Sequence, residues 1–346
     1  MIDTVGMNIP LRRQDVKKLF ARPDSAKDKL LLQYKWKRAT SALSGRSCLV
    51  FPCKTGNEIH VEMSLAKWVQ GHNIYGINNM QRLCFEGAKE IYRSFVIELT
   101  DPVLNKLRNH NYKLGRCDIT GSFNVGSQSN VVAIMAEIRL QLLAQEYNLV
   151  PYENLNGVET IYVGKSKRVA KIKFYNKYLE LMANPLPTDL PGRDIILKNA
   201  KNLIRFEVTL RSTDLENKGL RWSQNWSTQT VQDLLLDAFN KFLFTGEVKA
   251  RLDAKQIAAL KPRHKMLYGF WHEGANMMKH MPLHTYRRSR KELLQFNIDI
   301  GRPSQNGNGT MSLAKMLSPE RMSITWPKSL TTTGVIYGSS GWKQTG

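Results

Sequence analysis

Hydrophobic and polar residues alternate with strand periodicity in several short segments between residues 3 and 211. The clearest is 58–64, where Ile59, Val61 and Met63 alternate with polar side chains. Two longer segments, 80–98 and 131–147, have apolar residues at helical spacing instead. The expected strands are 3–11, 31–40, 47–53, 58–64, 113–125, 158–163, 169–177 and 202–211.

These strands lie on both sides of a packed helix, and the arrangement occurs twice. The order predicts an α+β fold with two ferredoxin-like, or RRM-like, antiparallel sheet units covered by helices. At 346 residues the chain is longer than one hydrophobic core usually organises. We therefore expect an N-terminal α+β unit at 1–110 and a second, catalytic α+β unit at 111–225. Within the second unit, the Pro-rich segment 183–193 is expected to be a connecting loop.

From Thr228 onward the pattern becomes helical, with expected helices over 231–244 and 253–260. A further helix is expected to begin at 281–286, resembling the recognition helix of a helix-turn-helix. Its exposed face would present Arg287, Arg288 and Lys291, while Leu293, Leu294 and Phe296 turn inward. Residues 226–303 are thus expected to form a helical DNA-binding module, although a merely solvated basic face fits the same pattern. The Gly, Ser, Thr and Asn content after Gly301 predicts a flexible tail over 304–346.

Composition changes the picture mainly through charge. Fifty-one Lys and Arg against 29 Asp and Glu give a net charge of +22, which favours a polyanionic partner and above all nucleic acid. A basic protein indifferent to nucleic acid is the alternative. No apolar run reaches the roughly 20 residues that span a bilayer, and no signal-peptide pattern begins the chain. Four cysteines lack zinc spacing, so we expect reduced thiols, a cytoplasmic location and no membrane partner.

The segment 158–180 places one tyrosine, Tyr175, among many cations. If residues 170–177 are extended, Ala170, Ile172 and Phe174 lie on one face and the tyrosine on the other. The basic residues of the segment are Lys165, Lys167, Arg168, Lys171, Lys173 and Lys177, of which Lys171, Lys173 and Lys177 share the tyrosine's face. A phenol with a pKa of about 10 is a weak nucleophile unless cations or a metal favour the phenolate. The alternatives are an ordinary sheet-surface tyrosine and Tyr178 as the nucleophile.

Three carboxylates occupy polar positions of predicted strands: Glu62, Asp118 and Glu207. Hard divalent cations such as magnesium and manganese prefer carboxylate ligands, and a metal that bridges a scissile phosphate neutralises charge during phosphoryl transfer. Each acid alone is more often a salt-bridged surface residue, and only the convergence of the three on Tyr175 would favour a metal site. Other motifs fail: His272-Glu273 lacks the second histidine of a zinc helix, and Gly164-Lys165-Ser166 lacks the first glycine of a P-loop.

Taken together, these motifs resemble the gene II replication-initiator family of filamentous bacteriophages, and more distantly the rolling-circle plasmid initiators of the replication-transfer family. The matching segments occur in the family's order and are HVEMSLAKWVQGHNIYG (60–76), RCDITGSF (116–123), GVETIYVGKSK with KIKFYNKYLEL (157–181), NLIRFEVTLRS (202–212) and, more loosely, 267–303.

The resemblance implies an enzyme that nicks and rejoins one DNA strand at a phage or plasmid origin. Tyr175 would attack the strand, remain bonded to the 5′ phosphate and release a 3′ hydroxyl that primes rolling-circle synthesis. Lys177 and Glu180 belong to the same motif, with Lys177 placed to stabilise phosphate charge.

The resemblance also implies that Asp118 and Glu207 hold the divalent cation, magnesium or manganese. Glu62 and His72 match a third motif and are weaker candidates for the metal. The His-hydrophobe-His motif of many nicking enzymes is absent from the sequence, so the metal would depend on carboxylates.

Expected partners are single-stranded and double-stranded origin DNA, and the replication helicase and polymerase of a bacterial host, with a homo-oligomer on DNA left open. The residues expected to contact DNA are Lys165, Lys167, Arg168, Lys171, Lys173, Arg205, Arg287, Arg288 and Lys291. The alternative from another class is a non-catalytic DNA-binding repressor or replication regulator. A conjugative relaxase is a third possibility.

Overall fold

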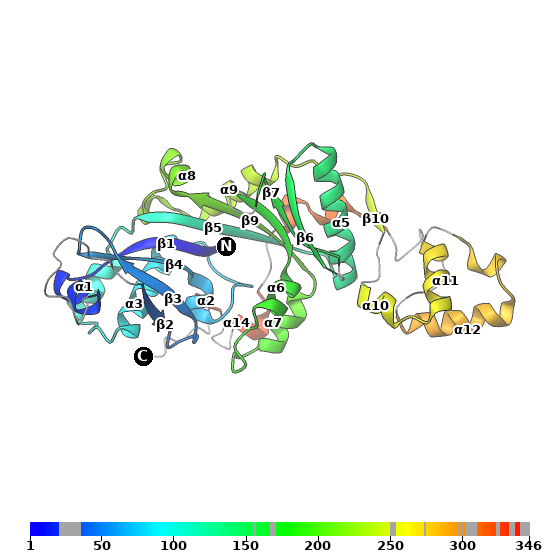
Figure 1. Ribbon diagram of the computed structural model, residues 1–346, viewed down its shortest axis with the longest axis horizontal. Coiled ribbons are helices and arrows are strands. Elements are labelled where there is room, and N and C mark those ends of the chain that lie inside the picture. The colour runs from blue at the N-terminus through cyan, green and yellow to red at the C-terminus, as the bar shows by residue number, and fades with distance from the viewer. Residues whose placement is uncertain are drawn as a thin grey trace, which may run out of the picture.

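A computed structural model describes residues 1–20, 36–154, 157–166, 171–249, 254–272, 275–296, 298, 300–301, 310–322, 326–331 and 336–339. Most of these residues form a body built on one large sheet, and the helices between 254 and 294 lie at one end of the molecule (Figure 1). The expected DNA contacts Lys167 and Arg168 fall outside the described residues.

Among the described residues, nine strands form one antiparallel sheet in the order β2-β3-β4-β1-β5-β9-β8-β7-β6. Their bounds are β1 (Ile2–Pro10), β2 (Lys37–Thr40), β3 (Ser47–Pro52), β4 (Glu58–Ser64), β5 (Leu114–Asn124), β6 (Leu149–Asn154), β7 (Gly157–Val163), β8 (Ile172–Asn176) and β9 (Leu203–Arg211). The predicted α+β class with antiparallel strands is confirmed. The two expected units nevertheless share this sheet, because β1 pairs directly with β5, with Val5 opposite Cys117.

The helices of the body include several that the hydrophobic pattern did not predict. Their bounds are α1 (Arg13–Phe20), α2 (Leu65–Gln70), α3 (Met80–Ser94), α4 (Asp101–Arg108), α5 (Gln128–Ala144), α6 (Lys177–Ala183), α7 (Arg193–Ala200), α8 (Ser212–Asn217), η1 (Ser223–Asn225) and α9 (Thr228–Phe239). Residues 65–70 form α2 because the Ser64 side chain accepts a hydrogen bond from the Lys67 amide and Gly71 ends the helix with a positive φ of 79°.

The two faces of the sheet differ sharply in polarity. One face presents core residues such as Val61, Ile119, Phe174 and Phe206, all fully buried, and α5 and α9 contact its strands. Polar side chains alternate with these residues and therefore point to the opposite face. This polar face is where the candidate chemistry of Tyr175 must lie.

The strand that contains Tyr175 is shorter than expected and ends at Asn176. The Asn176 side chain accepts hydrogen bonds from the amides of Tyr178 and Leu179 at 3.1 and 3.3 Å and so starts α6. Lys177 is therefore the first residue of a helix and not a strand residue, which corrects the expected strand over 169–177.

The helical module comprises α10 (Ala254–Ala259), α11 (Pro262–His272), η2 (Met277–Lys279) and α12 (Leu283–Leu294), packed around its own core that includes Leu267, Tyr286 and Leu293. Arg287, Arg288 and Lys291 are exposed on α12, as the pattern predicts. Leu294 was expected to turn inward but is 47% exposed, because it follows the buried Leu293 directly on the helix. The helix-turn-helix interpretation stays a prediction.

The segment after residue 309 is not the loose tail expected from its composition. Strand β10 (Glu247–Lys249) pairs with β11 (Thr310–Ser312), and α13 (Leu313–Met316), η3 (Pro319–Arg321) and α14 (Lys328–Thr331) follow. Leu313, Leu330 and Ile336 are fully buried, so apolar packing holds the described part of this segment against the body.

Shortening Leu330 tests that packing. Because Leu330 of α14 is fully buried and packs in one cluster with Ile74 and Leu181 of the body, Leu330→Ala should lower the free energy of unfolding by about 2–5 kcal/mol. Urea unfolding measures the change, and Leu243→Ala, at a side chain that is 71% exposed, is the matched control with little effect. Equal stability of the two variants would show that the segment is not packed.

Candidate active site

A cavity of about 470 Å³ opens on the polar face of the sheet around Tyr175. Residues from β1, β5, β7, β8 and β9, from α2 and α6, and from the loop after α2 meet there. Tyr175 lines this cavity. Its charged lining residues are Asp3, Lys67, Arg116, Asp118, Glu159, Lys173, Glu180 and Glu207. The fold therefore brings together Tyr175, Asp118, Glu180 and Glu207, which sequence analysis had selected from three separate motifs.

Tyr175 lies in the cavity with only 6% of its surface exposed. Its hydroxyl donates a hydrogen bond to Glu207 Oε2 at 3.2 Å. Burial, followed by the negative charge of Glu207, raises the pKa of Tyr175 well above its usual value. The expectation that neighbouring cations lower the pKa of this phenol is wrong for this conformation, in which the tyrosine is a neutral donor beside a carboxylate acceptor.

Cations pair with the carboxylates around this tyrosine. Lys173 Nζ lies 2.8 Å from Glu207 Oε1 and 5.1 Å from the centre of the Tyr175 ring. Arg116 binds both oxygens of Asp118 at 3.0 and 2.8 Å, and its Nη1 donates to Glu62 Oε1 at 2.5 Å. Glu62 is thus joined to the site through Arg116 while remaining on the exposed rim.

Lys177 reaches the site from the first turn of α6. Its ammonium is fully buried, lies 5.8 Å from the centre of the Tyr175 ring, and donates to Asn73 Oδ1 at 2.8 Å. Burial and the charge of Arg205 lower the pKa of Lys177 to about 7, against the opposing effect of Glu180. Glu180 accepts from Lys177 at 2.5 Å and from Lys67 at 3.0 Å.

Asp3 and Asn73 are site residues that sequence analysis missed. The alternation of Val5, Met7 and Ile9 would place Asp3 on the apolar face, but the register of β1 with β5 shifts between Ile2 and Val5. This bulge turns Asp3 to the polar face, where it accepts hydrogen bonds from Ser64 Oγ and from Asn73 Nδ2. A lone acid in an apolar strand was the one signal available.

The loop between α2 and α3 is held by side chains of the body. Gln70 Nε2 donates to the carbonyl of Tyr75 at 2.6 Å, and the Tyr337 amide of the C-terminal segment donates to Gln70 Oε1 at 2.7 Å. His72, a weak metal candidate, is fully buried inside this loop, with its Nδ1 3.4 Å from the Ile74 amide. Its neighbour Asn73 is the loop residue that lines the cavity.

The remaining basic candidates divide by exposure. Arg205, expected to contact DNA, is instead fully buried and donates to the carbonyl of Asn73 at 2.7 Å, so its position does not fit a DNA contact. Lys165 is exposed beyond β7. Lys171 does not share the Tyr175 site and pairs with Asp214 at 2.5 Å.

The acids of the site suit a hard cation by their chemistry. Burial raises the pKa of Asp118 and of Glu207, and the charge of Asp3 raises both further, although the charges of Arg116 and Lys173 oppose the rise. Carboxylates are the ligands that a hard cation prefers. In this structure Asp118 forms an ion pair with Arg116, and Glu207 forms one with Lys173. The described part of the chain contains no group of three or more His, Cys, Asp or Glu side chains that could hold a metal ion. Carboxylate oxygens are the right donors for magnesium or manganese, but the described side chains are not grouped around one point as metal ligands would be.

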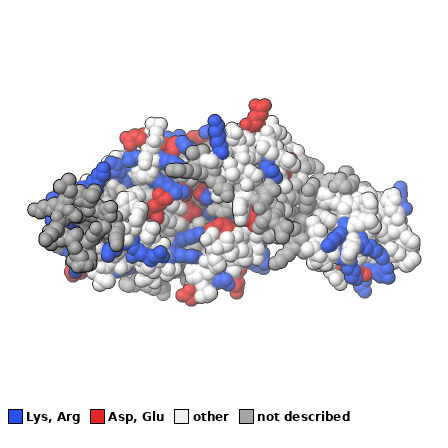
Figure 2. Space-filling model, in the orientation of Figure 1, with Lys and Arg blue, Asp and Glu red and all other residues white. Residues whose placement is uncertain are grey.

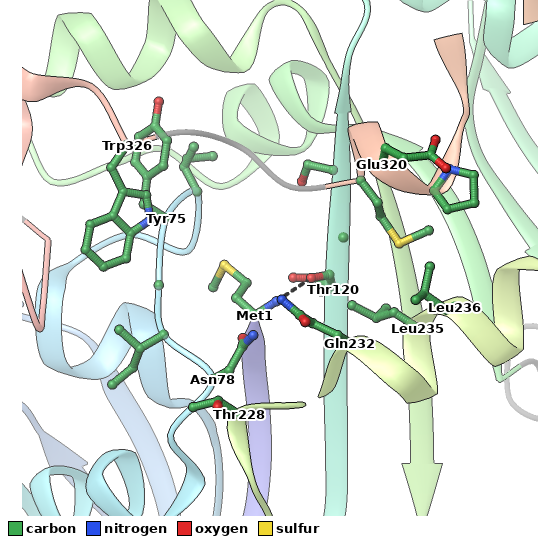
Figure 3. Close-up of a pocket in the computed structure, with 17 residues that line it drawn as sticks. Met1, Tyr75, Asn78, Thr120, Thr228, Gln232, Leu235, Leu236, Glu320 and Trp326 are labelled. Carbon is green, nitrogen blue, oxygen red and sulfur yellow. Dashed lines mark hydrogen bonds between the residues drawn. The ribbon is translucent and has the colours of Figure 1, made fainter. Parts of the chain in front are cut away.

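A second cavity, of about 600 Å³, is bounded by β5, α9, η3 and the loop after α2 (Figure 3). The Met1 amine donates to the Thr120 carbonyl at 2.6 Å in its wall, and burial lowers the pKa of this amine to about 5. Tyr75 and Trp326 lie on one side and Gln232 and Leu235 of α9 on the other (Figure 3). The described residues that line it include no lysine or arginine, so this cavity does not suit a phosphate.

Comparison with known proteins identifies the family of this chain. The model of the N-terminal region of the phage replication-associated protein family matches residues 1–229. The chain is 27% identical over 248 residues to the replication-associated protein of Enterobacteria phage I2-2, covering 70% of this chain and 69% of that protein. A solved rolling-circle replication initiator protein from Geobacillus stearothermophilus shows a TM-score of 0.31 and 13% identity, over 73% of this chain and 86% of that one.

The family model and the curated relative thus identify a DNA-replication protein, and its fold is of the α+β class. The chain belongs to the phage replication-associated protein family, whose N-terminal model covers well over half of its length. The resemblance to the gene II initiators is confirmed. Within the described residues, no helix is both long and apolar enough to cross a membrane.

Glu180 gives the site a measurable pH dependence. Burial alone would raise the pKa of Glu180, but the charges of Lys177 and Lys67 outweigh burial and lower the pKa to about 2 from its usual 4.5. The carboxylate therefore stabilises the folded state above about pH 4.5, and this contribution is lost as the pH falls toward 2. Unfolding of wild type and Glu180→Gln should converge in stability as the pH falls from 6 to 3.

The control for this measurement is Glu216→Gln, at a carboxylate whose side chain is 70% exposed and 3.8 Å from Arg221. Its stability difference from wild type should stay nearly constant over the same pH range. A Glu180→Gln difference that is equally flat would mean that the two lysines do not hold the Glu180 carboxylate.

Proposed function

We propose that this protein is a rolling-circle replication initiator that nicks and rejoins one DNA strand through a covalent 5′-phosphotyrosine at Tyr175. The observation that supports this proposal is the hydrogen bond from the Tyr175 hydroxyl to Glu207, inside a cavity that also holds Arg116 and Lys173. A nucleophile, a proton acceptor and cations for a phosphate are the parts that such a reaction needs.

In the proposed reaction, the Tyr175 oxygen attacks the scissile phosphorus and its proton passes to the Glu207 carboxylate. The bond between phosphorus and the 3′ oxygen breaks, and that oxygen takes up a proton from water to become the primer hydroxyl. A raised pKa makes Glu207 a stronger base than an ordinary carboxylate. Attack by a 3′ hydroxyl on the tyrosyl phosphate reverses the step and rejoins the strand.

Two cations near the Tyr175 ring would stabilise the added phosphate charge. Lys173 is about one-third exposed, and its Nζ lies 5.1 Å from the ring centre, while Lys177 Nζ lies 5.8 Å from it. Phosphoryl transfer depends mainly on positioning and on such charge stabilisation. We assign Lys177 this role together with the positioning of Glu180.

A divalent cation, magnesium or manganese, is part of the proposal, with Asp118 and Glu207 as its protein ligands. It would neutralise phosphate charge when bound. The support is that the pKa of both buried carboxylates is raised, and that the charge of Asp118 contributes to the rise at Glu207.

The exposed Arg287, Arg288 and Lys291 of α12 are proposed to hold duplex origin DNA. Figure 2 shows Lys and Arg gathered on this end of the molecule. The host helicase and polymerase remain expected partners of the nicked origin.

Replacing Tyr175 tests the nucleophile. Tyr175→Phe should abolish the covalent protein–DNA adduct on a single-stranded origin oligonucleotide while leaving DNA binding near the wild-type level, because only the hydroxyl is removed. Denaturing gels measure the adduct. Tyr178→Phe, three residues away in α6 with its ring 5.4 Å from Lys201 Nζ, is the matched control and should keep full adduct yield.

An adduct that persists in Tyr175→Phe and disappears in Tyr178→Phe would move the nucleophile to Tyr178. Salt-sensitive binding of the cognate origin with no nicking by the wild-type protein would instead favour the non-catalytic regulator.

The cation requirement has its own test. Nicking of a supercoiled origin plasmid should stop in chelator and return with magnesium or manganese. Asp118→Asn should raise the manganese concentration for half-maximal nicking by about tenfold or more, because one anionic ligand is lost. Asp214→Asn, at an acid that pairs with Lys171, should leave that concentration unchanged. Undiminished nicking in chelator would contradict the cation's role.

A further inference from the structure

Two tyrosines stand beside Tyr175 on the strands that complete this end of the sheet. Tyr175 on β8 pairs with Thr160 on β7, and Thr160 pairs with Tyr152 on β6. In the next row Lys173 pairs with Tyr162. Residues of one cross-strand row point to the same face, so both tyrosines share the polar face with Tyr175.

Both side chains line the cavity that contains Tyr175. Neighbouring strands lie about 4.8 Å apart, so Tyr152 stands about 10 Å from Tyr175 across two strand spacings, and Tyr162 about 5 Å from Lys173. Tyr152 is 50% exposed on the last strand of the sheet. A ligand that enters the cavity can therefore reach its ring, and the buried Ile161 and Phe174 hold the strands beneath it.

The surroundings of these rings indicate the ligand. Lys173, which pairs with Glu207, and Arg116 line the same cavity together with acids such as Glu159. Lys165 is exposed just after β7, so cations are available for the phosphates of a strand that passes the rings. Grooves that combine cations for the backbone with aromatic rings for the bases are the usual design for single-stranded nucleic acid. Bases in a duplex are stacked and paired, and only unpaired bases can lie against a protein ring in this way.

We propose that Tyr152 and Tyr162 form a stacking subsite for unpaired nucleobases next to the phosphate that Tyr175 attacks. This proposal rests on the proposed function and deepens it, because it names the residues that hold the bases next to the reacting phosphate. The rings hold the bases through their faces, without reading their sequence, and so keep the strand single at the point of attack.

Binding of two matched probes tests the subsite. The full chain with Tyr175→Phe, which cannot react, is titrated at fixed salt with a fluorescent single-stranded oligonucleotide of mixed sequence and with an abasic strand of the same length and phosphate number. Tyr152→Ala and Tyr162→Ala should each weaken binding of the first probe about 5- to 100-fold and leave binding of the abasic strand unchanged. Tyr152→Phe and Tyr162→Phe should bind both probes normally, since stacking needs only the ring.

Trp222→Ala is the control, because Trp222 is 40% exposed but absent from the cavity lining. Equal losses for both probes would mean that the tyrosines act on the backbone or on folding, which thermal unfolding of each variant checks. Weaker probe binding by the Phe variants would mean that the tyrosine hydroxyls, and not the rings, contact the DNA. Unchanged binding by every variant would mean that no stacking subsite exists. Each of these results overturns the proposal. Adduct formation by Tyr175 is measured separately, so failure of the nicking proposal is seen independently.

Discussion

The geometry of the site depends on the hydrogen bonds that the buried guanidinium of Arg205 donates to the loop after α2. Arg205 is fully buried on β9 and donates to the carbonyl oxygens of Asn73 and Ile74 at 2.7 and 3.3 Å. These bonds hold the loop after α2 against the sheet, and Asn73 in turn holds Lys177 and Asp3. A planar fork can bind two carbonyls at once, which an ammonium group cannot do in the same geometry. Through Asn73, this arginine thus links β9, which carries Glu207, to the Lys177 amine near the Tyr175 ring.

The charges of the site are nearly balanced although the whole chain carries +22. Arg116 and Lys173 pair with Asp118 and Glu207, and Lys177 pairs with Glu180. The excess positive charge therefore lies elsewhere, on exposed side chains such as those of α12. Under the proposed function, attraction to DNA over long distances and recognition of the reacting phosphate are then carried by different groups. The first weakens with salt, whereas the second depends on the geometry of buried groups that salt screens poorly.

Much of this arrangement follows from local sequence patterns. The alternation in β4, β5 and β9 correctly placed Glu62, Asp118 and Glu207 on a polar face, because each strand buries its other face. The pairing of β1 with β5, which joins the two expected units, could not be read from the pattern because strand partners are set by tertiary packing. Asp3 was missed for a related reason: a bulge reverses the face that simple alternation assigns to it.

The C-terminal region was misjudged because composition outweighed a few apolar residues. Few apolar residues occur in this part of the sequence, yet Leu330, Ile336 and Tyr337 are all buried against the body. Similarly, Lys177 was expected on a strand face, and the capping by Asn176 moved it into a helix whose first turn still reaches the Tyr175 ring. Short polar side chains that end strands or start helices set such details, and they leave little trace in hydrophobic periodicity.

The pairing of β10 with β11 has a mechanical consequence for how DNA is handled. The helical module leaves the body at Lys249 and the chain returns at Thr310, which is the residue opposite it in the ladder. Both connections therefore start from one point beside α5. Five peptide units join Lys249 to Ala254, so the Cα atoms of these two residues lie at most about 18 Å apart and the module is tethered closely to the body. Under the proposed function, a strand that binds this module would be presented to Tyr175 at high effective concentration, and release from one surface would not free it from the other.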